Sequence, residues 1–321
     1  MIISKTPFRI PLAGGGTDID FYYKRKTGLF LTCAFNQGIY VSVSKRTLDK
    51  KILIQTTSTQ FCYSVNNIKH ELIREVLKHF NIKNQIQINF FSTLPTGTGL
   101  GTSSSTIVGL ITAIKKLLKL KLTKKKIVEI AFNIERRKLG LRGGWQDQIA
   151  STFGGIIKVK IDKKGKFNVH KIRVKKKIID KLNSHMVLVY TNETRDSSKV
   201  IKSQDKKINI EYYDKIKKLV PSMNSAILKG DYEKIGQLFH THWNIKKKLS
   251  KNITNSSIDK VYKNLLKDKN IIGGKIIGAG GGGFFLMVTR NLKKTILKFQ
   301  KQKLNFTKLE IGKAGSSIIS D

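Results

Sequence analysis

Residues 94–105 read LPTGTGLGTSSS and lie between a predicted strand and a predicted helix. The glycines Gly97, Gly99 and Gly101 occupy alternate positions, and glycine lets backbone amides approach a ligand that a Cβ atom would exclude. Four hydroxyl side chains then open the helix, whose first turn offers unpaired amides and the positive end of the helix dipole. A serine that merely caps the helix explains one hydroxyl but not four. We therefore predict that this loop binds phosphate groups.

The sequence around this loop predicts an α+β protein. Apolar side chains recur every three or four residues from Ser103 to Leu120, which indicates a helix, and a second helix is expected after an N-cap at Thr123. Strands are predicted at residues 39–43, 51–54, 86–91, 156–161 and 186–190, and a strand, glycine turn and strand at 275–288. A charged stretch before Met186 suggests two domains, residues 1–183 and 184–321.

The sequence contains two other glycine clusters, one near each end of the chain. The glycines from Gly278 to Gly283 match the spacing of a dinucleotide-binding loop, but a strand follows them where that loop requires a helix. A nicotinamide-dependent dehydrogenase is therefore excluded. The cluster Gly14–Gly16, followed by Thr17 and Asp18, predicts by itself only a turn with an Asx cap. The loop at 94–105 is not a Walker loop, because no lysine follows its last glycine.

The composition is strongly basic, with 62 Lys and Arg against 21 Asp and Glu and a formal charge of +41. The lysines are spread along the chain instead of gathering in one segment, which favours a compositional bias over nucleic-acid binding. A polyanion-binding protein is kept as the non-enzymatic alternative. A nucleotide or a sugar phosphate is compatible with the charge.

Cysteine content and hydropathy indicate the compartment. Cys33 and Cys62 form no disulfide framework, and no apolar run approaches the roughly 20 residues that cross a bilayer. The first residues lack the features of a secretory signal. We expect a soluble, cytoplasmic protein with a small-molecule substrate and with neither a specific nucleic-acid partner nor a membrane partner. A homodimer is left open.

The three glycine loops, in this order, resemble the GHMP kinases, the superfamily of galactokinase, homoserine kinase and mevalonate kinase. The three family motifs correspond to residues 7–18, 95–105 and 275–283. The resemblance implies an N-terminal ribosomal-S5-like domain with a left-handed βαβ crossover, against the usual hand. It further implies a ferredoxin-like C-terminal domain, an active site between the domains, and ATP and Mg²⁺ as cofactors.

The resemblance also assigns roles to residues. Asp147 matches the aspartate that receives or orients the acceptor hydroxyl proton, and Arg9 matches the arginine that holds it ionised. Glu135 and Ser103 match the magnesium ligands, with Ser104 as the neighbouring alternative. Without the family, Glu135 reads as a surface residue and Asp147 as a helix cap. The nucleotide-binding residues are then Pro95, Gly97, Gly99, Leu100, Gly101, Thr102, Ser103, Ser104 and Ser105.

The substrate is suggested by the first motif. Galactokinase-like chains carry Glu and His where this chain has Gly15 and Gly16, which argues against galactose. The run of residues 14–18 resembles instead the D-glycero-D-manno-heptose 7-phosphate kinases and the fucokinases, and residues 190–198 are similar to a Tyr-Thr-x-x-x-Arg-x-Ser segment of the heptose kinases. The expected substrate-binding residues are Gly15, Gly16, Thr17, Asp18, Arg142, Arg195, Gly280 and Gly281, with Arg142 or Arg195 on the 7-phosphate.

The expected reaction is phosphoryl transfer from ATP to the anomeric C1 hydroxyl of heptose 7-phosphate, for the synthesis of surface-polysaccharide precursors. A fucokinase-like activity on an unphosphorylated sugar is the alternative. A regulator that binds sugar and ATP without catalysis is disfavoured, because Asp147, Glu135 and Arg9 are all present.

Overall fold

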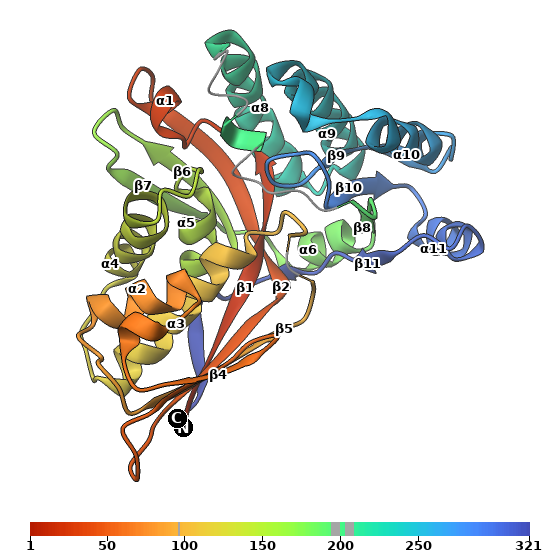
Figure 1. Ribbon diagram of the computed structural model, residues 1–321. Helices are drawn as coiled ribbons and strands as arrows, with labels where there is room; N and C mark the ends of the chain where they lie inside the picture. Colours follow the sequence, from red (N-terminus) through yellow and green to blue (C-terminus); the bar gives the residue numbers. More distant parts are fainter. Residues whose placement is uncertain (96, 194–199, 203–208) are drawn as a thin grey trace.

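The computed structural model describes residues 1–95, 97–193, 200–202 and 209–321. Its described strands form two sheets, each with its own helices (Figure 1). The first sheet has the order β13-β1-β2-β5-β3-β4, with β12 and β6 also pairing with β2, and β7 with β6. Its strands are β1 (Ile2–Ala13), β2 (Gly28–Lys45), β3 (Ile52–Gln55), β4 (Thr59–Cys62), β5 (Ile86–Ser92), β6 (Ile156–Ile161), β7 (Phe167–Ile172), β12 (Ile311–Gly312) and β13 (Ser317–Ser320).

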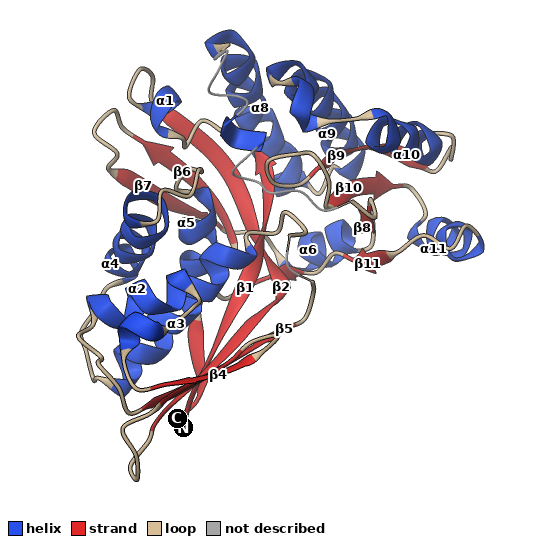
Figure 2. Cartoon of the chain, in the orientation of Figure 1, coloured by secondary structure: helices blue, strands red, loops and turns tan. Residues whose placement is uncertain are grey.

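Helices cover one face of this sheet (Figure 2). They are α2 (Glu71–His79), α3 (Thr102–Leu117), α4 (Lys124–Phe132) and α5 (Gln146–Phe153), and short helical segments lie at α1 (Asp20–Tyr23), η1 (Val65–Asn67) and the π-helical turn η2 (Asn133–Lys138). The central helix α3 packs on β1 and β2 and is buried from Ile107 to Ile114, which explains why its sequence is apolar on most sides.

The second sheet has the antiparallel order β11-β8-β10-β9. Its strands are β8 (Met186–Tyr190), β9 (Ile271–Ile276), β10 (Phe284–Thr289) and β11 (Phe306–Lys308). Its helical segments are α6 (Lys176–Asn183), α8 (Ile210–Lys229), α9 (Tyr232–Lys246), η3 (Lys247–Leu249), η4 (Lys251–Ile253), α10 (Ser256–Leu266) and α11 (Leu292–Lys301). Numbered along the chain within this sheet, the order is 4-1-3-2, as the predicted ferredoxin-like domain requires. The predicted two-domain α+β fold is confirmed.

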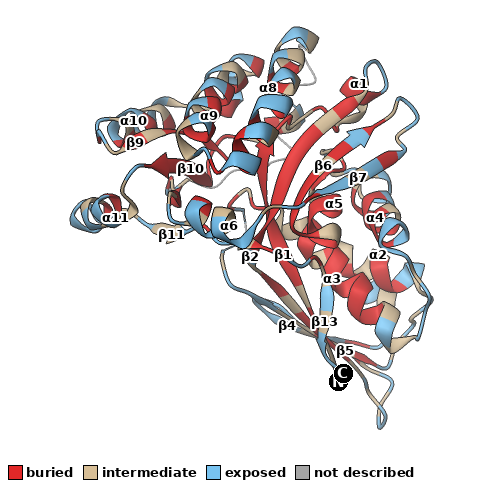
Figure 3. Ribbon diagram, turned by 180° about the vertical axis from the view of Figure 1, so that it is seen from behind, coloured by how far each residue is buried: buried red, intermediate tan, exposed pale blue. Residues whose placement is uncertain are grey.

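Helix α8 joins the two sheets. Its buried side chains Val220, Met223 and Ile227 belong to the same apolar cluster as Phe8 and Ile10 of β1. Strand β1 is buried along most of its length, as Figure 3 shows, because it has α3 on one side and α8 on the other. The two domains therefore share one hydrophobic core. No helix in the described part of the chain is long and apolar enough to cross a bilayer.

Most element predictions are confirmed, and the differences have local causes. Strands β6 and β8 span the predicted residues, and the Thr123 hydroxyl caps α4 by accepting from the Lys126 amide at 3.2 Å. Helix α3 ends at Leu117 instead of Leu120, because Lys119 has a left-handed backbone with φ of 55°.

The domain boundary and the hand of the crossover are two predictions that the described elements do not test. The chain enters the second sheet at Met186, but β12 and β13 return to the first sheet and pair with β2 and β1. The boundary between residues 183 and 184 stays a prediction. Strands β3 and β5 are parallel, and the left hand of the crossover also stays a prediction.

Candidate active site

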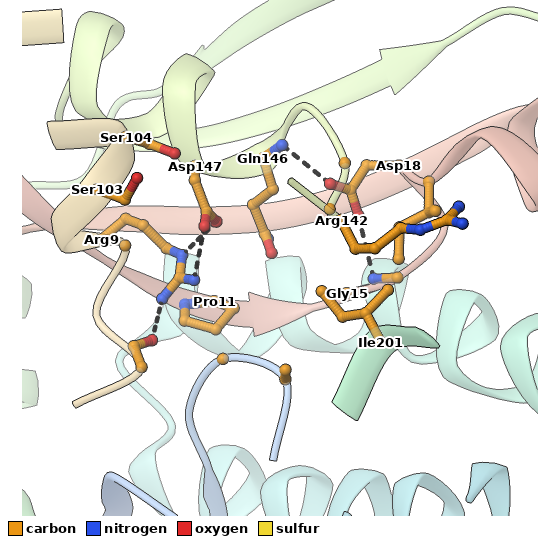
Figure 4. A pocket seen from close by; sticks show the side chains of 18 of the residues that line it. Arg9, Pro11, Gly15, Asp18, Ser103, Ser104, Arg142, Gln146, Asp147 and Ile201 are labelled. Atoms are coloured by element: carbon orange, nitrogen blue, oxygen red, sulfur yellow. Dashed lines mark hydrogen bonds and ion pairs between the residues drawn. The ribbon is translucent and has the colours of Figure 1, made fainter. Parts of the chain in front are cut away.

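A cavity of about 330 Å³ lies where the glycine loops of both sheets meet. The loop after β5, the turn after β1, and the loop after β9 all contribute to its wall, together with η2, α5 and α9. Figure 4 shows Asp147 and Arg9 facing each other at its centre, with Ser103 and Ser104 on one side and Asp18 on the other. The cavity therefore has one end next to the phosphate loop and another end next to the first motif.

The centre of the cavity holds a part-buried ion pair. The Arg9 guanidinium donates to both carboxylate oxygens of Asp147, from Nε at 2.6 Å and from Nη2 at 3.0 Å. Its third nitrogen, Nη1, donates to the Gly99 carbonyl at 2.5 Å, which ties the pair to the phosphate loop. Burial would raise the pKa of Asp147, but the charge and hydrogen bonds of Arg9 outweigh it and lower that pKa. Asp147 is therefore held ionised beside the cavity.

The phosphate loop ends in a helix without a side-chain cap. Gly101 is the N-cap of α3 with φ of 79°, a left-handed conformation that favours glycine. The Thr102 hydroxyl is buried and has no hydrogen-bond partner within the described residues. Free amides, a free hydroxyl and the helix dipole together suit a bound phosphate group.

Glu135 lies beside this helix end, in the π-helical turn η2, a distortion that often occurs at functional sites. It accepts hydrogen bonds of 2.6 Å from the Ser103 hydroxyl, the Ser104 hydroxyl and the Gln148 amide. The described residues contain no group of three or more His, Cys, Asp and Glu that could hold a metal by themselves. One carboxylate with adjacent hydroxyls nevertheless fits Mg²⁺, which in kinases keeps waters and substrate phosphates as its other ligands.

Asp18 is buried at the other end of the cavity. Its carboxylate accepts from the amides of Gln146 at 2.9 Å and Gly16 at 3.1 Å. A Cβ at Gly144 would come within 2.1 Å of this carboxylate, so glycine is needed there. Burial raises the pKa of Asp18, the charge of Asp147 raises it further, and the two amides oppose both effects. Asp18 is a fixed acceptor that can bind sugar hydroxyls.

The structure brings most of the predicted site residues to the cavity. Those that line it are Arg9, Gly15, Gly16, Asp18, Gly97, Gly99, Gly101, Thr102, Ser103, Ser104, Glu135, Arg142 and Asp147. Arg195 lies outside the described residues.

Six predicted residues do not line the cavity, and their binding roles stay predictions. The Thr17 hydroxyl is fully buried and donates to the carbonyls of Gly14 and Leu29, so it holds the turn after β1. The Ser105 hydroxyl donates to the Pro7 carbonyl at 3.1 Å. The others are Pro95, Leu100, which is fully buried, and the glycines Gly280 and Gly281, which adjoin Ile253.

Of the cavity-lining residues that the sequence did not assign to the site, three have buried basic side chains. They are His242 and Lys246 on α9 and Lys275 on β9. Lys275 belongs to the third motif, of which only the glycines Gly280 and Gly281 were assigned to the site. His242 and Lys246 are four residues apart and so share one helix face, and two polar residues on a buried face are the signal that could have found them.

Comparison with known proteins identifies the family of this chain. The family model described as the GHMP kinases N terminal domain matches residues 66–155, and that of the GHMP kinases C terminal matches residues 223–301. A D-glycero-alpha-D-manno-heptose 7-phosphate kinase of Campylobacter jejuni is 31% identical, over 95% of this chain and 94% of its own length. This chain belongs to the GHMP kinases. It is therefore an enzyme, an ATP-dependent phosphotransferase with an alcohol group as acceptor, and the polyanion-binding alternative is not needed.

Solved structures of GHMP kinases have the same fold. A D-glycero-D-manno-heptose 1-phosphate kinase from Bacteroides thetaiotaomicron superposes with a TM-score of 0.84 at 25% identity, covering 100% of this chain and 99% of its own. A putative sugar kinase from Campylobacter jejuni gives a TM-score of 0.80 at 30% identity, covering 99% and 97%. A bifunctional fucokinase/GDP-fucose pyrophosphorylase of Arabidopsis thaliana is 24% identical over 68% of this chain but only 21% of its own length.

Proposed function

We propose that this GHMP kinase transfers the γ-phosphoryl group of ATP to the C1 hydroxyl of D-glycero-D-manno-heptose 7-phosphate, forming the 1,7-bisphosphate. The observation that carries the proposal is the ionised Asp147, which faces the cavity between the phosphate loop and Asp18. The similarity to the Campylobacter jejuni heptose kinase over nearly the whole chain supports the choice of sugar. We place the product in the synthesis of surface-polysaccharide precursors.

In the proposed reaction the C1 hydroxyl gives its proton to Asp147 while its oxygen bonds to the γ-phosphorus. The bond from that phosphorus to the β–γ bridging oxygen breaks, and ADP leaves with this oxygen. The lowered pKa makes Asp147 a weak base. A weak base is sufficient when the transition state is loose, because the hydroxyl then loses its proton late. Arg9 keeps the carboxylate ionised and oriented.

We assign the nucleotide phosphates to the amides of Gly99 and Gly101 and to the first turn of α3. Glu135 and Ser103 would hold Mg²⁺, with Ser104 next to them. This ion, when bound, neutralises charge on the β- and γ-phosphates. Asp18, Gly15 and Gly16 form the proposed sugar end of the cavity, and Arg142 lies there with them. Residue 195 is kept as a candidate for the sugar phosphate.

The test is a substrate panel with purified protein, ATP and Mg²⁺. It compares D-glycero-D-manno-heptose 7-phosphate with the 1-phosphate, the unphosphorylated heptose, fucose and galactose. We expect kcat/KM to be at least tenfold higher for the 7-phosphate, and ³¹P NMR to show a second, anomeric phosphate in the product. Faster turnover of fucose or of the unphosphorylated heptose would remove the heptose 7-phosphate assignment and leave the kinase.

A further inference from the structure

The cavity wall that the second domain contributes carries three side chains without a role in the proposed reaction. His242 and Lys246 project from α9, and Lys275 projects from β9. They are 3%, 9% and 1% exposed, respectively. Lysine is almost never so deeply buried unless it is paired, so the partners of these residues decide what the wall can do.

Neither lysine has a carboxylate partner within the described residues. The Lys246 ammonium donates to the Gly278 carbonyl, and the Lys275 ammonium donates to the Leu12 carbonyl at 3.1 Å. An ammonium group has three donors, and these are the single hydrogen bonds that each makes in the described part of the chain. Donors on both lysines are therefore left for a ligand.

His242 supplies a second, independent observation. Both of its ring nitrogens are buried, and neither has a hydrogen-bond partner within the described residues. A buried polar group without a partner is rare in a folded protein and calls for an explanation such as a ligand or a water. Burial lowers the pKa of His242 well below its usual value, and the nearby charges of Lys275 and Lys246 lower it further. The neutral ring has one donor and one acceptor nitrogen for a bound group.

The charged groups at this wall have an excess of positive charge. Burial, and then the charge of Arg9, lower the pKa of Lys246 to about 7. Burial and the charges of Lys246 and Arg9 also lower the pKa of Lys275. The Asp147 carboxylate accepts two hydrogen bonds from the Arg9 guanidinium. Its negative charge is therefore already paired with Arg9. A buried excess of positive charge is costly unless an anion joins it.

We propose that Lys246, Lys275 and His242 form a phosphate subsite additional to the phosphate loop, and that it binds a terminal phosphate dianion. The inference rests on the proposed function, whose reaction brings two such groups: the acceptor's own phosphate and the γ-phosphoryl group of ATP. The subsite belongs to the second domain, whereas the loop at α3 belongs to the first. Binding a phosphate on this wall links the two domains across the substrate.

The test replaces Lys246 by methionine (Lys246→Met), with Lys248→Met as the control. Lys248 is exposed and lies two residues further on, in η3, which follows α9 directly. Titration calorimetry measures Kd for heptose 7-phosphate, unphosphorylated heptose, Mg·AMP-PNP and Mg·ADP. We expect Lys246→Met to raise Kd about tenfold to hundredfold for either heptose 7-phosphate or Mg·AMP-PNP, because it removes a charged hydrogen bond to the phosphate. Kd for unphosphorylated heptose and for Mg·ADP should change less than twofold. In the Lys248→Met control, every Kd should stay within twofold of the wild-type value.

The ligand that loses affinity identifies the phosphate. Loss with heptose 7-phosphate assigns the subsite to the acceptor, and loss with Mg·AMP-PNP alone assigns it to the γ-phosphoryl group. Unchanged binding of both ligands overturns the subsite. If the enzyme turns over only unphosphorylated sugars, the proposed substrate is wrong, whereas the Mg·AMP-PNP measurement still tests the subsite.

Two further readouts separate ligand binding from a structural role. Without ligands, Lys246→Met should not lower the melting temperature, because it removes a buried charge near Arg9 and Lys275. A structural lysine would lower it. Kd for the phosphate ligand should rise up to tenfold per pH unit above about pH 7, as Lys246 loses its proton. Lys246→Arg should flatten this profile, because arginine stays charged, and the ligand, with a second pKa of about 6, is already a dianion there.

Discussion

Asp147 shows how its surroundings, more than its pairing, make a carboxylate functional. Arg46 and Asp49 form a bidentate pair of the same kind, with distances of 2.8 and 2.6 Å, but in the loop after β2 and partly exposed to solvent. In the Arg9–Asp147 pair the arginine side chain is only 6% exposed, and the aspartate faces the cavity beside the phosphate loop. The burial and the neighbouring loop therefore distinguish the candidate catalytic pair from a surface ion pair.

Asp147→Asn should reduce kcat by about a hundredfold to ten-thousandfold, the usual contribution of a positioned acid or base. Kd for ATP should change little, because in the described part of the loop Asp147 is connected to it through Arg9, which stays in place. Steady-state kinetics and calorimetry measure the two effects. Asp49→Asn is the matched control, and its kcat should stay within twofold. A variant at residue 147 that keeps more than a tenth of the wild-type kcat contradicts the assigned role.

The sequence predicted which loops meet at the site but not the direction of each side chain. Ser103 and Ser105 occupy one motif, yet the first hydroxyl faces Glu135 and the second faces the Pro7 carbonyl. Two residues along a helix differ by roughly 200° in direction, and tertiary packing decides which side faces the cavity. Lys246 was missed for a related reason, because its role depends on Arg9 and Gly278, which are far away in the sequence.

At the level of elements, two glycine loops from different sheets contact each other through their backbones. A Cβ on Gly99 would lie 2.9 Å from the Ile277 carbonyl oxygen, and a Cβ on Gly278 would lie 2.6 Å from the Gly99 carbonyl oxygen. Each loop could be predicted from its own glycines, with its flanking strand or helix. Their contact could not, because nothing local in either sequence reports a neighbour nearly 180 residues away.

Gly99→Ala should raise KM for ATP at least tenfold, because the methyl group separates these loops and shifts the Gly99 carbonyl that binds Arg9. Gly140→Ala is the control for backbone strain alone. Gly140 also has positive φ, 64° against 79° at Gly99, but no atom lies within 4 Å of its added Cβ. Both variants should lose about 1–2 kcal/mol of unfolding free energy in urea. Equal KM values in the two variants would show that the loop contact is unimportant for ATP binding.

At the scale of the whole molecule, a polar cluster joins the first domain to α8. The Tyr22 hydroxyl donates to Asp214 at 2.6 Å, and the Lys26 ammonium donates to the other oxygen at 2.5 Å. Burial raises the pKa of Asp214, but the bonds from Lys26 and Tyr22 outweigh it and lower that pKa. Because α8 also packs on β1 and β2, this cluster helps to fix the two walls of the cavity.

Asp214→Asn should lower the unfolding free energy at pH 7 by about 1 kcal/mol, the value for a partly exposed pair. The folded-state pKa is lowered, so the stabilisation is present above the unfolded pKa of about 3.9 and is lost as pH falls through the folded pKa. The difference between wild type and variant in urea should therefore be present at pH 7 and should vanish in acid, once the pH lies below the folded-state pKa. Asp180→Asn, at an exposed position on α6, should change stability at neither pH. A gap that persists in acid would mean that Asp214 acts through packing instead of charge.

The last strand has a consequence for how the enzyme is made. Strand β13 pairs with β1, so the two termini lie side by side (Figure 1), and the Ser316 hydroxyl bonds to Thr6 at 2.7 Å. A growing chain exposes the outer edge of β1 until residues 317–320 have left the ribosome, and an exposed edge invites pairing with other chains. Chaperone dependence should therefore be greatest just before β13 emerges, although every residue of the candidate site has by then been made.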